Sequence, residues 1–186
     1  MTRTGRLTRQ AAPALAVLAA LSGPARAEVT AGITEYGEFR ADILGQMEEV
    51  YGLSPGVRIG PNRLVRQGTA VEARLCTQLG YVVTLAADPP EDMPETVDVA
   101  VRHPRLTRPD GASSTGYSFS SGVGEGRLYA GFLFYYAWEL QPGAYTIDVS
   151  LRGKLLASKT FTVTVPPDPA QPGAARAGAC GPPAVS

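Results

Sequence analysis

The strongest constraint on the fold is a strict alternation of apolar and polar residues near the end of the chain. The apolar members of the two alternating runs are Tyr145, Ile147, Val149 and Leu151, then Phe161, Val163 and Val165. A period of two is typical of β-strands that bury one face. Between the runs, Gly153-Lys154 predicts a tight turn, because glycine accepts the positive φ that a short hairpin requires. The sequence therefore predicts an antiparallel hairpin.

Shorter runs of the same kind predict further strands. The predicted strands cover residues 33–40, which we expect at a sheet edge, a segment at 71–75, and residues 80–87, 97–102 and 129–138. Gly- and Pro-containing turns separate them at spacings near ten residues. Residues 41–52 are ambiguous, because their apolar residues have helical spacing but Gly45 interrupts them. Many short strands without a clear helix predict an all-β fold, an antiparallel β-sandwich over residues 28–165.

The predicted strand at 129–138 is dense in aromatic residues. In an extended segment, one face would hold Ala130, Phe132, Phe134, Tyr136 and Trp138, and the other Leu133 and Tyr135. Such a strip is either a ligand platform or the centre of the core. The large area that each ring buries favours the core.

The first 27 residues have the three parts of a secretory signal peptide. Arg3, Arg6 and Arg9 precede an uncharged, apolar stretch over 11–23, and Ala25-Arg26-Ala27 offers the small residues that a signal peptidase reads. We expect cleavage after Ala27 and a periplasmic or secreted protein; an uncleaved N-terminal anchor is the alternative. No later segment is long and apolar enough to predict a transmembrane helix.

Removal of residues 1–27 changes the charge balance of the chain. The precursor has 17 basic and 17 acidic residues, and the processed chain keeps 13 basic residues against 17 acidic ones. A mildly acidic protein lacks the basic surface that a phosphate backbone requires, which argues against nucleic acid as a partner. It argues equally against an anionic membrane surface.

The end of the chain differs in composition from the predicted domain. Residues 166–186 are rich in Pro, Ala and Gly, and we expect them to form a disordered tail. This tail contains Cys180, and the only other cysteine, Cys76, lies in an apparent strand. An oxidising compartment permits a disulfide between Cys76 and Cys180, with two independent thiols as the alternative.

Residues for catalysis or metal binding are not evident in the sequence. The single histidine, His103, precedes Pro104, and we expect it at a loop edge in a structural or solvent-facing role. The serine-rich segment 113–121, predicted as a loop, contains no G-x-S-x-G motif, and the glycines of 122–126 lack the lysine of a phosphate-binding loop. The acidic stretch at 88–98 has no EF-hand spacing. We therefore predict no catalytic residue, no cofactor and no metal.

Several segments together resemble a known family. They are Ile33-Thr34-Glu35-Tyr36-Gly37, His103-Pro104-Arg105-Leu106 with Pro109-Asp110-Gly111, Trp138-Glu139-Leu140-Gln141-Pro142-Gly143-Ala144-Tyr145, Gly153-Lys154-Leu155-Leu156 and Lys159-Thr160-Phe161. Their order and spacing over residues 30–165 resemble a bacterial family known as domain of unknown function 3859. The resemblance implies a periplasmic protein with an immunoglobulin-like sandwich. It implies no activity and no site residue.

These observations favour a non-catalytic exported module that binds another envelope component or a ligand through its loops or an edge strand. The side chains of interest for such binding are Tyr117 and Phe119, with Arg102, Arg105 and Arg108 on the neighbouring segment. Two alternatives stay open. One is a structural subunit of an envelope assembly, and the other is a periplasmic hydrolase with carboxylates that the sequence does not single out.

Overall fold

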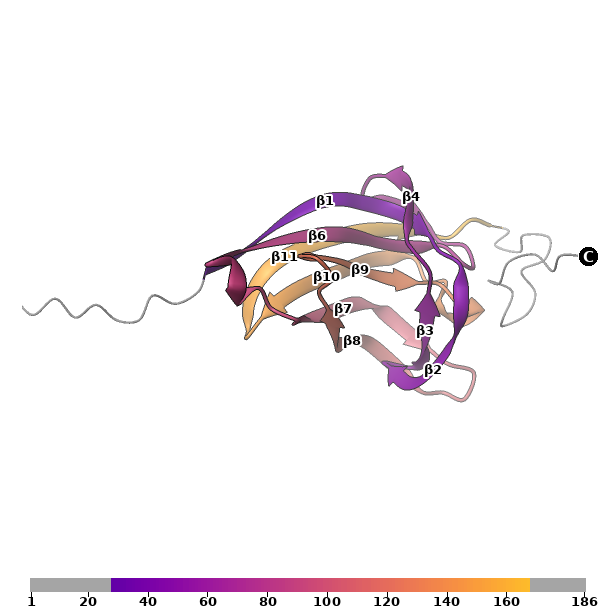
Figure 1. Cartoon of the computed structure of the whole chain (residues 1–186). Coiled ribbons are helices and arrows are strands. Elements are labelled where there is room, and N and C mark those ends of the chain that lie inside the picture. Colours follow the sequence, from indigo (N-terminus) through magenta and orange to yellow (C-terminus); the bar gives the residue numbers. More distant parts are fainter. Residues whose placement is uncertain (1–27, 168–186) are drawn as a thin grey trace, which may run out of the picture.

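The computed structural model describes residues 28–167, which form two facing β-sheets and a separate two-stranded hairpin (Figure 1). Sheet I has the order β4-β1-β6-β9, with β1 Glu28–Arg40, β4 Arg63–Gln67, β6 Gln78–Asp88 and β9 Arg127–Leu133. Sheet II has the order β5-β11-β10-β7-β8, with β5 Ala70–Glu72, β7 Thr96–Thr107, β8 Ser113–Gly122, β10 Gly143–Leu151 and β11 Lys154–Thr164. The hairpin, here called the arm, consists of β2 Ile43–Tyr51 and β3 Ser54–Ile59. Two short 3-10 turns complete the described elements, η1 Pro90–Asp92 and η2 Ala137–Glu139.

The all-β antiparallel sandwich predicted from the sequence is confirmed. Neighbouring strands are antiparallel except for β5, which pairs with β11 in parallel. The core lies between the sheets, where alternate residues of facing strands are fully buried. Its members include Tyr81 and Val83 of β6, Val99 of β7, Ile147 of β10 and Phe161 of β11.

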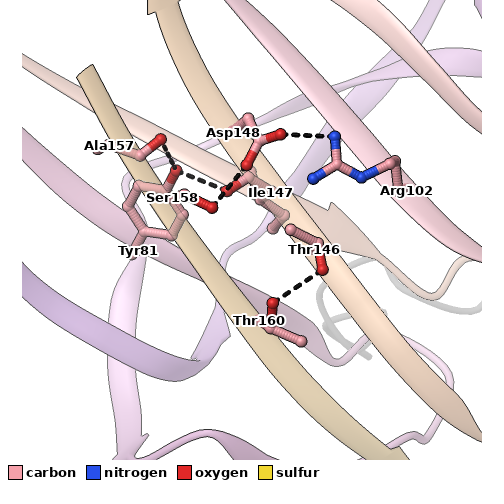
Figure 2. Close-up of polar contacts among 8 residues, drawn as sticks. All are labelled: Tyr81, Arg102, Thr146, Ile147, Asp148, Ala157, Ser158 and Thr160. Atoms are coloured by element: carbon pink, nitrogen blue, oxygen red, sulfur yellow. Dashed lines mark hydrogen bonds and ion pairs between the residues drawn. The ribbon is translucent and has the colours of Figure 1, made fainter. Parts of the chain in front are cut away.

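A tyrosine hydroxyl joins the two sheets across this core. Tyr81 of sheet I donates hydrogen bonds to the carbonyl oxygens of Ile147, at 2.9 Å, and Ala157, at 3.4 Å, both in sheet II (Figure 2). Burial, assisted by the nearby charge of Asp148, raises the pKa of Tyr81 far above its ordinary value. The hydroxyl therefore stays protonated and donates its single proton mainly to the nearer carbonyl oxygen, that of Ile147, with Ala157 as the weaker second acceptor.

The outer face of sheet II carries the polar residues that alternate with the core. Asp148 accepts a hydrogen bond from Ser158 at 2.6 Å and forms an ion pair with Arg102 at 2.6 Å, while Thr146 and Thr160 are hydrogen-bonded at 2.8 Å (Figure 2). The predicted inward and outward faces of this hairpin are thus confirmed. Its turn is one residue earlier than predicted. Arg152 and Gly153 both have positive φ, as a two-residue hairpin loop requires, and Leu151 pairs with Lys154.

Several sequence predictions were wrong in detail. β1 starts at Glu28 and lies between β6 and β4 at its C-terminal end, where Gly37 to Arg40 pair with β4, so it is not simply an edge strand. The segment 41–52, which the sequence left ambiguous, contains strand β2 and no helix, because the arm pairs two extended segments with one another. The serine-rich segment is the edge strand β8, not a loop, because it pairs with β7 along most of its length.

The aromatic strip also differs from the prediction. Strand β9 ends at Leu133 and η2 begins after three intervening residues, at Ala137, so Tyr136 and Trp138 do not continue the face of Phe132. Phe132 and Phe134 are buried in the core, in agreement with the predicted core role of the strip.

The predicted signal peptide at 1–27 and nearly all of the predicted tail at 166–186 lie outside the described residues. In the part of the chain that the structure describes, no helix has the length and apolar character needed to cross a bilayer.

Candidate functional site

A cavity lies under the arm, along the edge of sheet I. Its volume is about 380 Å³, and its walls come from β9, from β8 at the neighbouring edge of sheet II, from η2 and from the arm. Figure 1 shows the arm leaving the β1–β4 end of sheet I and extending toward β8. The arm thus covers the place where the edges of the two sheets would otherwise face solvent.

Three kinds of contact hold the tip of the arm in place. The ring of Tyr51 packs on Phe119 of β8, with centroids 5.1 Å apart. Ser54 donates a hydrogen bond to Glu139 of η2 at 2.7 Å, and Arg108 donates one to the carbonyl oxygen of Leu53 at 3.3 Å. Arm, β8 and η2 are therefore joined around the cavity.

Glycine is required at the turn of the arm. Gly52 has a φ of 65°, and a Cβ atom there would lie 2.9 Å from the ring of Tyr117. Glycine therefore allows both the turn conformation and the close approach to β8.

Most of the cavity wall is apolar and aromatic. The aromatic side chains that line it are Tyr51, Tyr117, Phe119, Tyr129, Phe132, Tyr135 and Trp138, and the aliphatic ones include Met47, Leu53, Val57, Ile59, Leu106 and Leu133. They come from five separate segments of the chain. Tyr117 and Phe119, which the sequence suggested as binding side chains, both line the cavity.

Gln78 is a polar residue in this wall with an unsatisfied donor. Its side chain is 1% exposed, it pairs with Leu133 of β9 and Phe39 of β1, and its Nε2 makes no hydrogen bond in the described structure. Buried polar groups in native proteins nearly always have a partner. A free buried donor in a cavity wall therefore indicates a place where an acceptor is expected.

His103 is buried in strand β7, and the predicted loop-edge position is wrong. It is 8% exposed and contacts the rings of Phe132, Tyr145 and Tyr117 at centroid distances of 5.8, 6.1 and 6.1 Å. Burial lowers the pKa of His103, although a hydrogen bond to the carbonyl oxygen of Pro104 opposes this shift. Nδ1 lies 2.7 Å from that oxygen, so Nδ1 carries the proton of the neutral ring and Nε2 is left as an acceptor.

Glu139 is the acidic residue of the cavity. It is 4% exposed, its Oε1 accepts the hydrogen bond of Ser54, and its Oε2 accepts the backbone N–H groups of Tyr135 at 2.7 Å and Tyr136 at 2.8 Å. Burial raises the pKa of Glu139, and these three hydrogen bonds oppose the shift. The carboxylate closes the η2 turn and anchors the arm at the same time.

The buried tyrosines Tyr117 and Tyr129 also line the cavity. Burial raises the pKa of Tyr117, and the charge of Glu139 raises it further; burial also raises the pKa of Tyr129, with Tyr117 as the second cause. Tyr129 donates a hydrogen bond to the carbonyl oxygen of Leu79 at 3.2 Å. Both hydroxyls remain protonated at physiological pH.

The arginines suggested by the sequence do not line the cavity. Arg102 pairs with Asp148 on the outer face of sheet II, Arg105 contacts Ser113, and Arg108 pairs with Asp110 and holds the arm. Cys76 lies in a turn and has positive φ, not in the strand that was predicted. Its predicted partner, Cys180, lies outside the described residues, so the disulfide stays a prediction.

The described residues offer little catalytic machinery. Ser54 and Glu139 pair a hydroxyl with a carboxylate, but the second carboxylate oxygen is occupied by backbone N–H groups and no third group orients the serine. Within residues 28–167, no group of three or more His, Cys, Asp and Glu side chains is placed to hold a metal ion. The arrangement is suited to enclosing an apolar molecule and contacting it with a few polar groups.

Sequence reasoning missed Gln78 and Glu139. The only signal for either was a polar residue within an apolar segment, Gln78 before Leu79 and Glu139 beside Trp138. Neither segment reveals its burial, since the arm that covers the cavity comes from a distant part of the chain.

Comparison with known families agrees with this architecture. The model of the family described as domain of unknown function (DUF3859) matches residues 27–163. The chain belongs to the DUF3859 family. The matched region contains the arm and both sheets except the last residue of β11, and hence every described wall of the cavity.

A solved structure shows the same type of fold. An immunoglobulin-like protein from Pseudomonas aeruginosa is similar to this DUF3859 chain with a TM-score of 0.50 and 19% sequence identity, over 74% of this chain and 97% of the other. At this identity, the likeness concerns the fold alone, and it confirms the immunoglobulin-like class that the family resemblance implied. No curated protein matches the chain.

Proposed function

We propose that this protein is a non-catalytic ligand-binding module that takes up a small, mainly apolar molecule in the cavity under the arm. The observation that carries the proposal is a cavity with apolar and aromatic walls from five segments and one unsatisfied donor, Gln78. Protein interiors are close-packed and leave few voids larger than a water molecule. A volume of about 380 Å³ falls within the range typical of small-molecule sites.

The signal-peptide pattern of residues 1–27 supports a periplasmic or secreted location for this activity. The ligand would then be a molecule of the cell envelope or of the surrounding medium. Binding to an envelope protein is the alternative, and the concave position of the cavity between the arm and the sheet edges favours a small molecule over a protein surface.

The single tryptophan of the chain gives a direct test, because Trp138 lines the cavity. The exported protein is titrated with N-phenyl-1-naphthylamine, an uncharged aromatic probe. We expect saturable energy transfer from Trp138 to the probe, with one molecule bound per chain.

A pair of valines on the arm provides the variants for this test. Val57 lines the cavity, whereas Val50 is 61% exposed on the neighbouring strand of the same arm. Val57→Phe reduces the space and should weaken probe binding about tenfold or more, while Val50→Phe should leave it unchanged. Absence of saturable binding, or equal weakening by both variants, would contradict the proposal.

A further inference from the structure

The charge of the cavity gives information about the class of ligand. Glu139 lies in the wall and is 4% exposed, yet within residues 28–167 no lysine or arginine is at ion-pair distance from it. Buried carboxylates are normally paired with a cation, because the loss of water around the charge is unfavourable. Glu139 has hydrogen-bond donors around it but no described countercharge.

The contacts of Glu139 are those of an ionised carboxylate. Ser54 donates to Oε1, and the backbone N–H groups of Tyr135 and Tyr136 donate to Oε2. A protonated carboxyl would present its own O–H and need an acceptor, whereas an ionised one only accepts. Three donors on two oxygens therefore stabilise the charged form.

The negative charge of Glu139 acts on groups in the cavity wall and behind it, and no described cation in the wall offsets it. It raises the pKa of the hydroxyl of Tyr117 in the cavity wall and of Tyr145 in the core behind it, in both cases after the larger effect of burial. Among the described residues of the wall there is no lysine or arginine, and the buried position of His103 disfavours its protonated form. An anionic ligand would therefore be repelled.

The aromatic walls favour a cation for a second, independent reason. The faces of tyrosine and tryptophan rings attract positive charge, most strongly where water is excluded. Trp138, Tyr117, Tyr129 and Tyr51 all line the cavity. In addition, the free Nε2 of Gln78 is suited to an oxygen acceptor on the same ligand.

We infer that the cavity selects a positively charged ligand, a small aromatic or alkyl ammonium compound that also carries a hydroxyl or carbonyl oxygen. The inference rests on the proposed function and adds the charge and the polar group of the molecule bound. The ammonium group lies beside Glu139 and the tyrosine and tryptophan rings, and the oxygen accepts the hydrogen bond of Gln78.

Three phenols of nearly equal shape test the charge selection. They are (4-hydroxyphenyl)trimethylammonium, its uncharged isostere 4-tert-butylphenol and the anion 4-hydroxybenzenesulfonate, each titrated into the exported protein by calorimetry at neutral pH. We expect the cation to bind about tenfold more tightly than its isostere. The sulfonate should bind more weakly than either.

Two variants with the same change of net charge separate the cavity from the rest of the protein. Glu139→Gln removes the buried charge and should bring the cation and the uncharged phenol to nearly equal affinity. Glu38→Gln is the control, because Glu38 pairs with Arg66 on sheet I and does not line the cavity, and it should keep the preference.

A third variant leaves the anchor of the arm intact, in case Glu139→Gln prevents folding. Ser121 lines the cavity near its edge, and Ser121→Lys adds a positive charge there without removing a contact of Glu139. It should weaken binding of the cation about tenfold and strengthen binding of the sulfonate.

The outcomes separate the charge selection from ligand binding itself. If the uncharged phenol binds as tightly as the cation, or if Ser121→Lys leaves their ratio unchanged, the charge selection is wrong while ligand binding stands. If none of the three compounds binds and N-phenyl-1-naphthylamine does not bind either, the proposed function is wrong as well.

Discussion

The interior of the sandwich has two regions that differ in whether their buried polar groups have partners. Around Tyr81, the buried hydroxyl contacts two carbonyl oxygens of the opposite sheet, and the described core residues around it have no unsatisfied buried side-chain nitrogen or oxygen. Around the cavity, Gln78 keeps a free donor and Glu139 keeps a charge without a described cation. Both regions are reached by the same strand, β6, within four residues.

The difference separates a part of the molecule that maintains the fold from a part that is incomplete without another molecule. Close packing and satisfied hydrogen bonds stabilise the first region on its own. The second region has space, aromatic surface and unsatisfied polarity, which are the properties of a binding site. Substitutions should therefore affect stability in the first region and ligand binding in the second.

The largest effect is expected from the same substitution made in each region. Ile147 is fully buried between the sheets, whereas Ile59 is half-buried on the arm beside the cavity. Ile147→Ala should lower the free energy of unfolding by about 2–5 kcal/mol, because it leaves a cavity in a packed core. Ile59→Ala should cost less than half of that. Urea denaturation followed by circular dichroism measures both, and equal losses would remove the distinction between the regions.

A smaller effect is expected from the hydroxyl that joins the sheets. Tyr81→Phe leaves the carbonyl groups of Ile147 and Ala157 without this donor and should lower the free energy of unfolding by about 1–3 kcal/mol. The control is Tyr129→Phe, which removes a single, longer hydrogen bond at the cavity and should cost about 1 kcal/mol or less. A neutral Tyr81→Phe would show that the cross-sheet bond adds nothing to stability.

The pH dependence of stability tests the burial of His103. Its pKa is lowered in the folded protein relative to the ordinary value of 6.5, so the unfolded chain binds the proton more readily. Stability attributable to His103 is therefore complete above pH 6.5, decreases as the pH falls below that value and levels off below the lowered pKa. Within that window the slope approaches about 1.4 kcal/mol per pH unit.

Thermal denaturation of the wild type and His103→Gln between pH 7.5 and pH 5 checks this sign. His103 is the only histidine of the chain, so the difference between the two proteins isolates its contribution. The wild type should lose stability relative to the variant as the pH falls. Parallel curves would contradict a buried, neutral imidazole among the rings of Tyr117, Phe132 and Tyr145.

The smallest effect is expected on the outer face of sheet II. Arg102 pairs with Asp148, but its side chain is 62% exposed, and exposed ion pairs contribute little to stability. Arg102→Ala should change the free energy of unfolding by less than about 1 kcal/mol and should leave ligand binding unchanged. A larger decrease in the free energy of unfolding, measured by the same urea titration, would show that the ion pair on this face contributes substantially to stability.

The sequence predicted the regular part of the fold because alternation is a local property. The apolar residues of β6, β7, β10 and β11 have a period of two, and the structure buries them as predicted. The arm was not predictable in this way. The apolar residues of its first strand have helical instead of alternating spacing, and the arm is held by contacts with distant segments of the chain.

The candidate site was predicted only in part, for the same physical reason. Tyr117 and Phe119 were noticed as aromatics in a serine-rich segment, but Gln78, His103 and Glu139 are buried by contacts with segments distant in the sequence: β1 and β9 around Gln78, β8, β9 and β10 around His103, and the arm beside Glu139. Burial that depends on three distant segments has no signature in the local pattern of any one of them.

The most direct test is a crystal structure of the exported protein with bound (4-hydroxyphenyl)trimethylammonium. We expect the compound under the arm, with its ammonium group against Trp138, Tyr117 and the carboxylate of Glu139. Its hydroxyl oxygen should lie at hydrogen-bond distance from Gln78. A structure in which the arm is closed onto β9 with the cavity filled by side chains, or in which the compound lies elsewhere, would contradict this expectation.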